Sequence, residues 1–162
     1  MISIKYQTSL PRSYAGWLSD IDWKYFVTLH FKDGSKPSVE VATKAVKHLA
    51  IRLGAHLNGR RSKTKLSVFP VLEESSGGVP LVHILIGPEN SRGRSIGEVH
   101  EVIADIWGKQ DFCINPKVLG KANRGWFERV DDNKHDVLSY VCKEFKQGKD
   151  PVLVDAISLN TK

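Results

Sequence analysis

The sequence predicts a single α+β domain in which helices pack against a central antiparallel sheet. Segments rich in β-branched and aromatic residues alternate with segments whose apolar residues recur at helical spacing. Clusters of glycine, proline and asparagine separate these segments. The length of 162 residues is typical of one domain. We expect its core over about 24–147, with extensions at 1–23 and 148–162.

The first half of the core is predicted to contain two strands joined by a helix. The segment 24–31, KYFVTLHF, has the aromatic and β-branched composition of a strand. Ser38 is expected to cap a helix that ends before Gly59. The segment 65–73, KLSVFPVLE, is predicted to form a second strand. Pro70 within it indicates a sheet edge or a bulge, because proline has no N–H for a central ladder.

The second half is predicted to begin with a strand and a helix. The segment 80–87, PLVHILIG, is apolar enough to be a central strand that is covered on both faces. Ser95 and Glu98 form a capping box that starts the helix. Short strands are expected in 111–119 and 125–130.

The order of elements is β-α-β-β-α-β, followed by a last helix that Asp131 or Asp132 is expected to cap. The tail PVLVDAISL is predicted to add one more strand. This order is the split βαβ, ferredoxin-like arrangement, which RNA-recognition modules (RRM) share. In that arrangement the first and third strands are central neighbours, and the helices lie on one face. The fold hosts many functions, so the function must be argued from particular residues.

The charge distribution favours nucleic acid as a partner. The formal net charge is +6, and basic residues concentrate in 58–65, 91–95 and 115–124. Solvated loops are the alternative explanation for each cluster. No apolar run reaches the length of a membrane span, and the N-terminal residues do not resemble a signal peptide. We therefore expect a cytoplasmic protein with no membrane partner.

Two pairs of residues could carry chemistry. Glu73 and His83 lie ten residues apart across a predicted hairpin, so a carboxylate and an imidazole can meet on one sheet face. A divalent cation accepts both ligand types, although a hydrogen-bonded pair or a core histidine is the alternative. Tyr140 and Lys143 share a helix face that is offset from the apolar one. A tyrosine helped by a cation is a nucleophile, whereas alone this spacing is common on helix surfaces.

Together these stretches resemble the HUH endonucleases, in particular the single-tyrosine rolling-circle replication initiator (Rep) branch. The match covers about 24–147 and follows the order of the family motifs: FVTLHF (26–31), PLVHILIG (80–87) and YVCK (140–143). The second motif of the family carries a His-hydrophobic-His pattern. Here Leu81 occupies the first histidine position, and His83 is the retained second histidine.

The resemblance implies a nickase and strand transferase that acts on single-stranded origin DNA of a plasmid, phage or other mobile element. Tyr140 would form a 5′-phosphotyrosine, and Lys143 would lie beside the phosphate or favour the phenolate. Mg²⁺ or Mn²⁺ would be held by Glu73 and His83.

Leucine cannot bind a metal, so this implied site lacks one protein ligand. Water, His30 or Glu74 are the candidate replacements. His30 is expected to lie on the strand beside His83, on the same face as Thr28. Alternatively, the chain binds DNA without cutting it.

The basic loops would then track the DNA backbone, and Trp126 would stack on a base, although core packing is the alternative for Trp126. Because no helicase segment is recognised, a host helicase is the expected partner for unwinding. The basic residues proposed for DNA binding are Arg60, Arg61, Lys63, Lys65, Arg92, Arg94, Lys121 and Arg124.

Three other functions compete with this interpretation. One is a non-catalytic single-stranded DNA- or RNA-binding domain of the same fold, although the run of alternating aromatics typical of RNA-recognition modules is missing from the sequence. Another is a transposase or relaxase of the HUH superfamily, although the additional histidines of relaxases are missing. The third is a small structural or partner-binding protein in which the motifs are accidental.

Overall fold

The computed structural model describes residues 12–32, 37–60, 66–73, 80–87, 96–118, 125–142 and 151–159. Within these ranges the strands and helices follow the predicted order β-α-β-β-α-β and then a helix, with one further helix at the start. The elements are α2 (Arg12–Asp20), β1 (Tyr25–His30), α3 (Val39–Asn58), β2 (Val68–Glu73), β3 (Leu81–Ile86), α4 (Ile96–Gly108), β4 (Phe127–Arg129), α5 (Lys134–Cys142) and the 3₁₀ turn η2 (Val154–Ala156).

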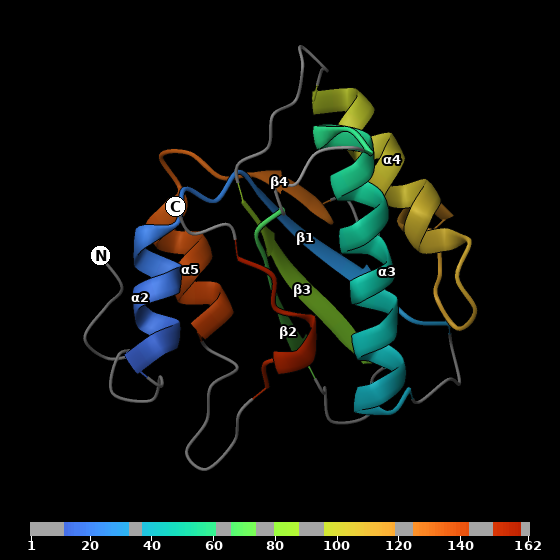
Figure 1. Ribbon diagram of the computed structural model, residues 1–162, viewed down its shortest axis with the longest axis horizontal. Coiled ribbons are helices and arrows are strands. Elements are labelled where there is room, and N and C mark those ends of the chain that lie inside the picture. Colours follow the sequence, from blue (N-terminus) through green and yellow to red (C-terminus); the bar gives the residue numbers. More distant parts are fainter. Residues whose placement is uncertain are drawn as a thin grey trace.

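The four strands form an antiparallel sheet in the order β2-β3-β1-β4, which confirms the predicted ferredoxin-like split βαβ class with β1 and β3 at the centre. Helices cover both faces of this sheet (Figure 1). The helices α3 and α4 pack on one face, and α2 and α5 pack on the other. The sequence predicted helices on one face only. The second layer forms because alternate strand residues such as Phe69 and Leu85 present an apolar surface on that side as well.

The helix α3 begins and ends where its sequence signals predict. The hydroxyl of Ser38 accepts a hydrogen bond from the Val41 N–H at 3.2 Å. Gly59 follows the helix with a φ of 91°, a conformation that favours glycine. None of the described helices is long and apolar enough to cross a membrane.

The position of β2 at the edge of the four-stranded sheet explains how this strand accommodates Pro70. The N–H groups of Val68 and Leu72 donate to the C-terminal segment, at Ser158 and Pro151. Pro70 lies between them and has no N–H to donate, while its carbonyl accepts from the Leu153 N–H at 3.1 Å. The tail therefore does pair with β2, but only through isolated bridges at either end of η2 rather than as a full strand.

Other predicted boundaries differ from the structure. The segment 111–118 forms a turn with one isolated bridge, between Cys113 and Phe31, instead of a strand. The helix α5 begins at Lys134, because the Asn133 carbonyl accepts its first bond, from the Val137 N–H. Asp131 lies in the preceding turn, where its side chain accepts from the backbone N–H of the next residue. The capping serine predicted for α4 lies outside the described residues.

Candidate functional site

The candidate site lies on the sheet face that α2 and α5 cover. On this face the register places Thr28, His83 and Val71 in one row across β1, β3 and β2. The next row contains His30, Leu81 and Glu73. Adjacent strands lie about 4.8 Å apart, so neighbours within a row are in side-chain reach, and so are diagonal neighbours with long side chains.

His83 is held by hydrogen bonds at both ring nitrogens. Its side chain is 2% exposed, with Nδ1 3.0 Å from the Thr28 hydroxyl and Nε2 3.0 Å from Oε2 of Glu73. A carboxylate can only accept, so Nε2 carries a proton, and in the neutral ring Nδ1 accepts from the threonine hydroxyl. Glu73 is itself largely buried, with 20% of its side chain exposed. The sequence prediction that Glu73 meets His83 across the hairpin is therefore confirmed.

Tyr140 approaches this pair from α5. Its ring lies edge-on to the His83 ring, with centroids 5.2 Å apart and planes at 87°. Phe26 stacks on His83 at 5.4 Å and meets Tyr140 edge-on at 6.0 Å. Leu138 and Val141 anchor the helix in the core, which leaves Tyr140 at the rim with 43% of its surface exposed. The tyrosine side chain is therefore partly exposed while its ring is fixed against the imidazole.

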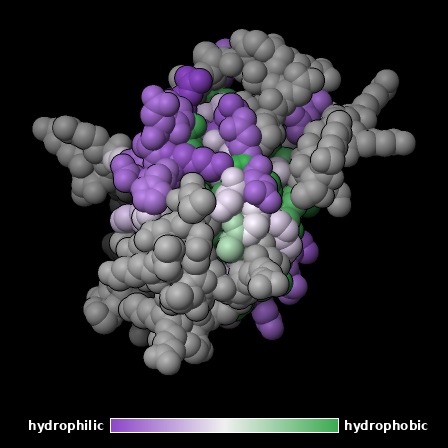
Figure 2. Space-filling view, turned by 90° about the vertical axis from the view of Figure 1, so that its left-hand side faces the viewer, coloured by the Kyte–Doolittle hydropathy of each residue, from purple (hydrophilic) through white to green (hydrophobic). Residues whose placement is uncertain are grey.

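Hydrophilic side chains gather on part of the surface over this layer (Figure 2).

A metal fits this arrangement only in part. A carboxylate oxygen and an imidazole nitrogen suit Mg²⁺ or Mn²⁺, and both ions retain waters where protein ligands are few. In this conformation Glu73 and His83 bond directly to each other, so an ion would have to replace that hydrogen bond. The described residues contain no group of three or more histidine, cysteine, aspartate or glutamate side chains placed to hold a metal. His30 shares the face, as expected, but Leu81 separates it from Glu73 in the register.

Several proposed site residues lie outside the described part of the chain: Lys143, Glu74, Arg61, Lys63, Lys65, Arg92, Arg94, Lys121 and Arg124. Arg60 is described and follows α3, on the opposite sheet face from Tyr140 (Figure 1).

Trp126 does not present its ring to a base in this structure. It is 5% exposed, and its ring centroid lies 4.6 Å from the centroid of the His100 ring and 5.6 Å from that of the Phe127 ring. The structure therefore shows core packing for Trp126, which was the alternative to base stacking. The sequence does not distinguish the two situations, since the burial of Trp126 depends on the pairing of β1 with β4 and on the contact with His100 of α4.

The two cysteines offer no competing nucleophile at neutral pH. Burial raises the pKa of the Cys113 thiol to about 12 and that of the Cys142 thiol to about 11. Both side chains are 1% exposed or less, so little thiolate forms and little reagent reaches it.

Comparisons with known proteins add no assignment, because no family model, no curated protein and no solved structure matches this chain.

Phe26 and Thr28 belong to the site although their contacts with His83 were not predicted. The signal was present in the strand, since both residues alternate with His30 and must share its face. Their partner depended on the register between β1 and β3, which sequence spacing alone leaves open.

His83→Ala is expected to lower the free energy of unfolding by about 3 kcal/mol. The change leaves a cavity beneath Phe26 and removes a hydrogen-bond partner from both Thr28 and Glu73. Denaturant unfolding measures the effect, with the exposed His48→Ala as the control expected to stay within about 0.5 kcal/mol of wild type. Equal stability of the two variants would contradict a structural role for the His83 hydrogen bonds.

Proposed function

We propose that this protein is a single-stranded DNA nickase and strand transferase that initiates rolling-circle replication of a mobile element. The observation that carries the proposal is the meeting of Tyr140, His83 and Glu73 at one place on the sheet. These residues come from α5, β3 and β2, and the resemblance to the Rep branch selects the same three. Tyr140 is 43% exposed, whereas the His83 ring against which it packs is 2% exposed.

The reaction uses the Tyr140 hydroxyl as the nucleophile. Its oxygen attacks a backbone phosphorus, a Tyr–O–P bond forms and the bond from phosphorus to the 3′-oxygen breaks. The phenolic proton leaves, and the 3′-oxygen takes up a proton to give a free 3′-hydroxyl. The 5′-phosphotyrosine retains the energy of the broken diester, so a later 3′-hydroxyl can reverse the step and join a strand.

The surrounding residues position this tyrosine. Phe26 contacts both aromatic rings and fixes the angle between them. Glu73 accepts the Nε2 proton of His83 in a hydrogen bond, which fixes the orientation of the imidazole ring against Tyr140. Mg²⁺ or Mn²⁺ bound by Glu73 and His83 in place of that hydrogen bond would supply positive charge at the scissile phosphate. In this proposal a host helicase unwinds the duplex and supplies the single strand.

A covalent-adduct assay tests the function. The protein is incubated with a randomised single-stranded DNA pool and Mn²⁺ or Mg²⁺, and the products are separated on a denaturing gel. One sample of the pool carries a 3′ label and another a 5′ label. A 5′-phosphotyrosine retains the 3′-labelled fragment on the protein and releases the 5′-labelled one.

We expect a protein-sized band with the 3′ label only, dependent on the divalent ion. The same pool annealed into duplex is the matched control and should give far less adduct. A pool that binds the protein but yields no adduct under any metal condition would overturn the nickase proposal.

A non-catalytic single-stranded nucleic-acid-binding domain is the second candidate. The observation that favours it is that both His83 nitrogens are already hydrogen-bonded and that Leu81 stands where a second histidine would lie. It predicts pool binding that does not respond to Mn²⁺ or to chelator, together with no adduct.

A further inference from the structure

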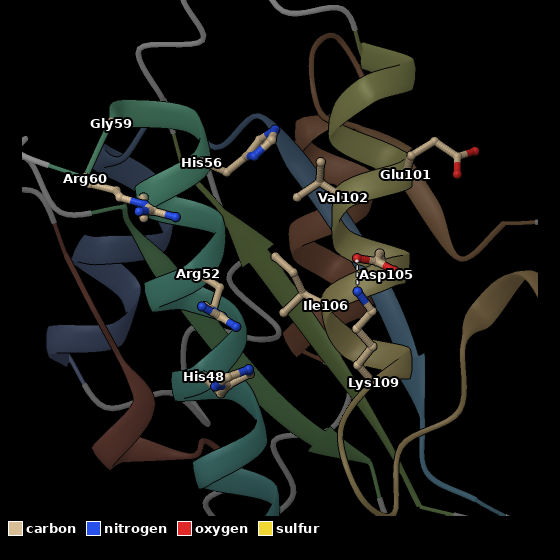
Figure 3. A pocket seen from close by; sticks show the side chains of 11 residues that line it. His48, Arg52, His56, Gly59, Arg60, Glu101, Val102, Asp105, Ile106 and Lys109 are labelled. Carbon is tan, nitrogen blue, oxygen red and sulfur yellow. Dashed lines mark ion pairs between the residues drawn. The ribbon is translucent and has the colours of Figure 1, made fainter.

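A groove of about 800 Å³ lies between α3 and α4, on the face of the sheet opposite Tyr140 (Figure 3). Four basic residues from α3 and its C-terminus line one wall at intervals of four residues: His48, Arg52, His56 and Arg60. Each interval of four residues advances about 6 Å along a helix and keeps the side chains on one side. The floor is apolar and is formed by Val102 and Ile106 of α4.

The positive charge of this wall is not neutralised within the described residues. On the facing helix, Asp105 pairs with Lys109 at 3.1 Å, and Glu101 pairs with Lys117. Glu101 also points away from the groove (Figure 3). Neither Arg52 nor Arg60 forms an ion pair with any residue that the structure describes. The acids beside the groove therefore have partners, while two arginines face it without one.

An exposed aromatic side chain lies at one end of the groove. A second hollow, of about 590 Å³, shares His48 and Lys109 with the first and is lined by Phe112. Phe112 is 53% exposed and has a φ of 67°, a left-handed conformation that bulky residues rarely adopt. Neither burial nor backbone preference accounts for phenylalanine at this position, and such outliers concentrate at binding sites.

We propose that this track, from Arg60 through Arg52 and Lys109 to Phe112, binds single-stranded nucleic acid. The cations contact successive phosphates, and the Phe112 ring stacks on a base at the end of the track. An unpaired base is required because a duplex keeps its base faces stacked inside. The proposal goes beyond the nicking activity, since the track lies on the other sheet face and acts without Tyr140.

The first experiment measures how binding depends on salt. Fluorescence anisotropy follows a labelled oligothymidylate, with EDTA present so that no cleavage occurs. For the double variant Arg52→Ala/Arg60→Ala we expect weaker binding and a plot of log K against log salt concentration that is shallower by about 1.4, or about 0.7 for each phosphate contact. Arg129→Ala is the matched control, because it removes one exposed arginine at β4, outside the lining of the groove.

The second experiment isolates the stacking contact. Phe112→Leu, which keeps an apolar side chain but removes the aromatic face, is expected to weaken oligothymidylate binding about tenfold at every salt concentration. Phe112→Tyr keeps the ring and should bind like wild type. Thermal unfolding of each variant checks that the fold is retained.

Three results would overturn the proposal: an unchanged salt slope in the double arginine variant, equal binding by the leucine and tyrosine variants, or equal losses for duplex and single strand. These measurements need no metal and no covalent step, so they fail or succeed independently of the nickase proposal.

Discussion

Tyr140→Phe is expected to reduce the rate of adduct formation at least about a thousand-fold, because the nucleophilic oxygen is the only group removed. The aromatic contacts with His83 and Phe26 involve the ring, which phenylalanine retains. The variant should therefore fold and should bind the single-stranded pool as wild type does. The measurement is the initial rate of adduct formation with the 3′-labelled pool.

Tyr14→Phe is the matched control for this prediction. Tyr14 lies in the same helical layer, on α2, but is 7% exposed and packs against Phe69. Its hydroxyl cannot reach a DNA strand, so its removal should leave the adduct rate unchanged. An adduct that persists in Tyr140→Phe would remove Tyr140 from the reaction.

Leu81→His is expected to tighten Mn²⁺ binding by roughly 10- to 100-fold. Leu81 lies between His30 and Glu73 in the register and two residues from His83 on the same face. A histidine there would add a third protein ligand beside the proposed ligands Glu73 and His83, and each ligand of a metal site contributes on this scale. Leu81 is only partly buried, so the fold should accept the change.

Isothermal titration calorimetry with Mn²⁺ measures this prediction. Leu81→Met is the matched control, since a thioether is a poor ligand for a hard cation and preserves the apolar volume. Glu73→Ala in the Leu81→His background should cancel most of the gain. Equal Mn²⁺ affinity of the histidine and methionine variants would contradict the proposed metal site beside position 81.

The parts of the site that the sequence predicted rest on local geometry. Glu73 and His83 flank a short hairpin connection, and a hairpin forces nearby residues of its two strands together. Tyr140 was expected off the apolar face because helical spacing separates it from Leu138 and Val141, and it is exposed while they are buried.

The parts that the sequence did not predict depend on contacts between distant segments. The helix α2 precedes the predicted core and is held by tertiary packing, as where Tyr14 packs edge-on against Phe69 of β2. The burial of Trp126 and the partners of Phe26 follow from strand registers that join residues far apart in the chain. Sequence periodicity assigns a face to each residue, but it does not assign its neighbour across the sheet.

The proposed function requires a covalent bond between Tyr140 and DNA, which can be tested by identifying the linked residue. After reaction with the randomised single-stranded pool and Mn²⁺, nuclease trimming and trypsin digestion, tandem mass spectrometry locates the residual nucleotide. Trypsin should release the segment 135–143, HDVLSYVCK, in which Tyr140 is the single tyrosine. We expect a 5′-phosphonucleotide on Tyr140. A nucleotide linked to any other residue, or a DNA-treated protein that carries none, would contradict it.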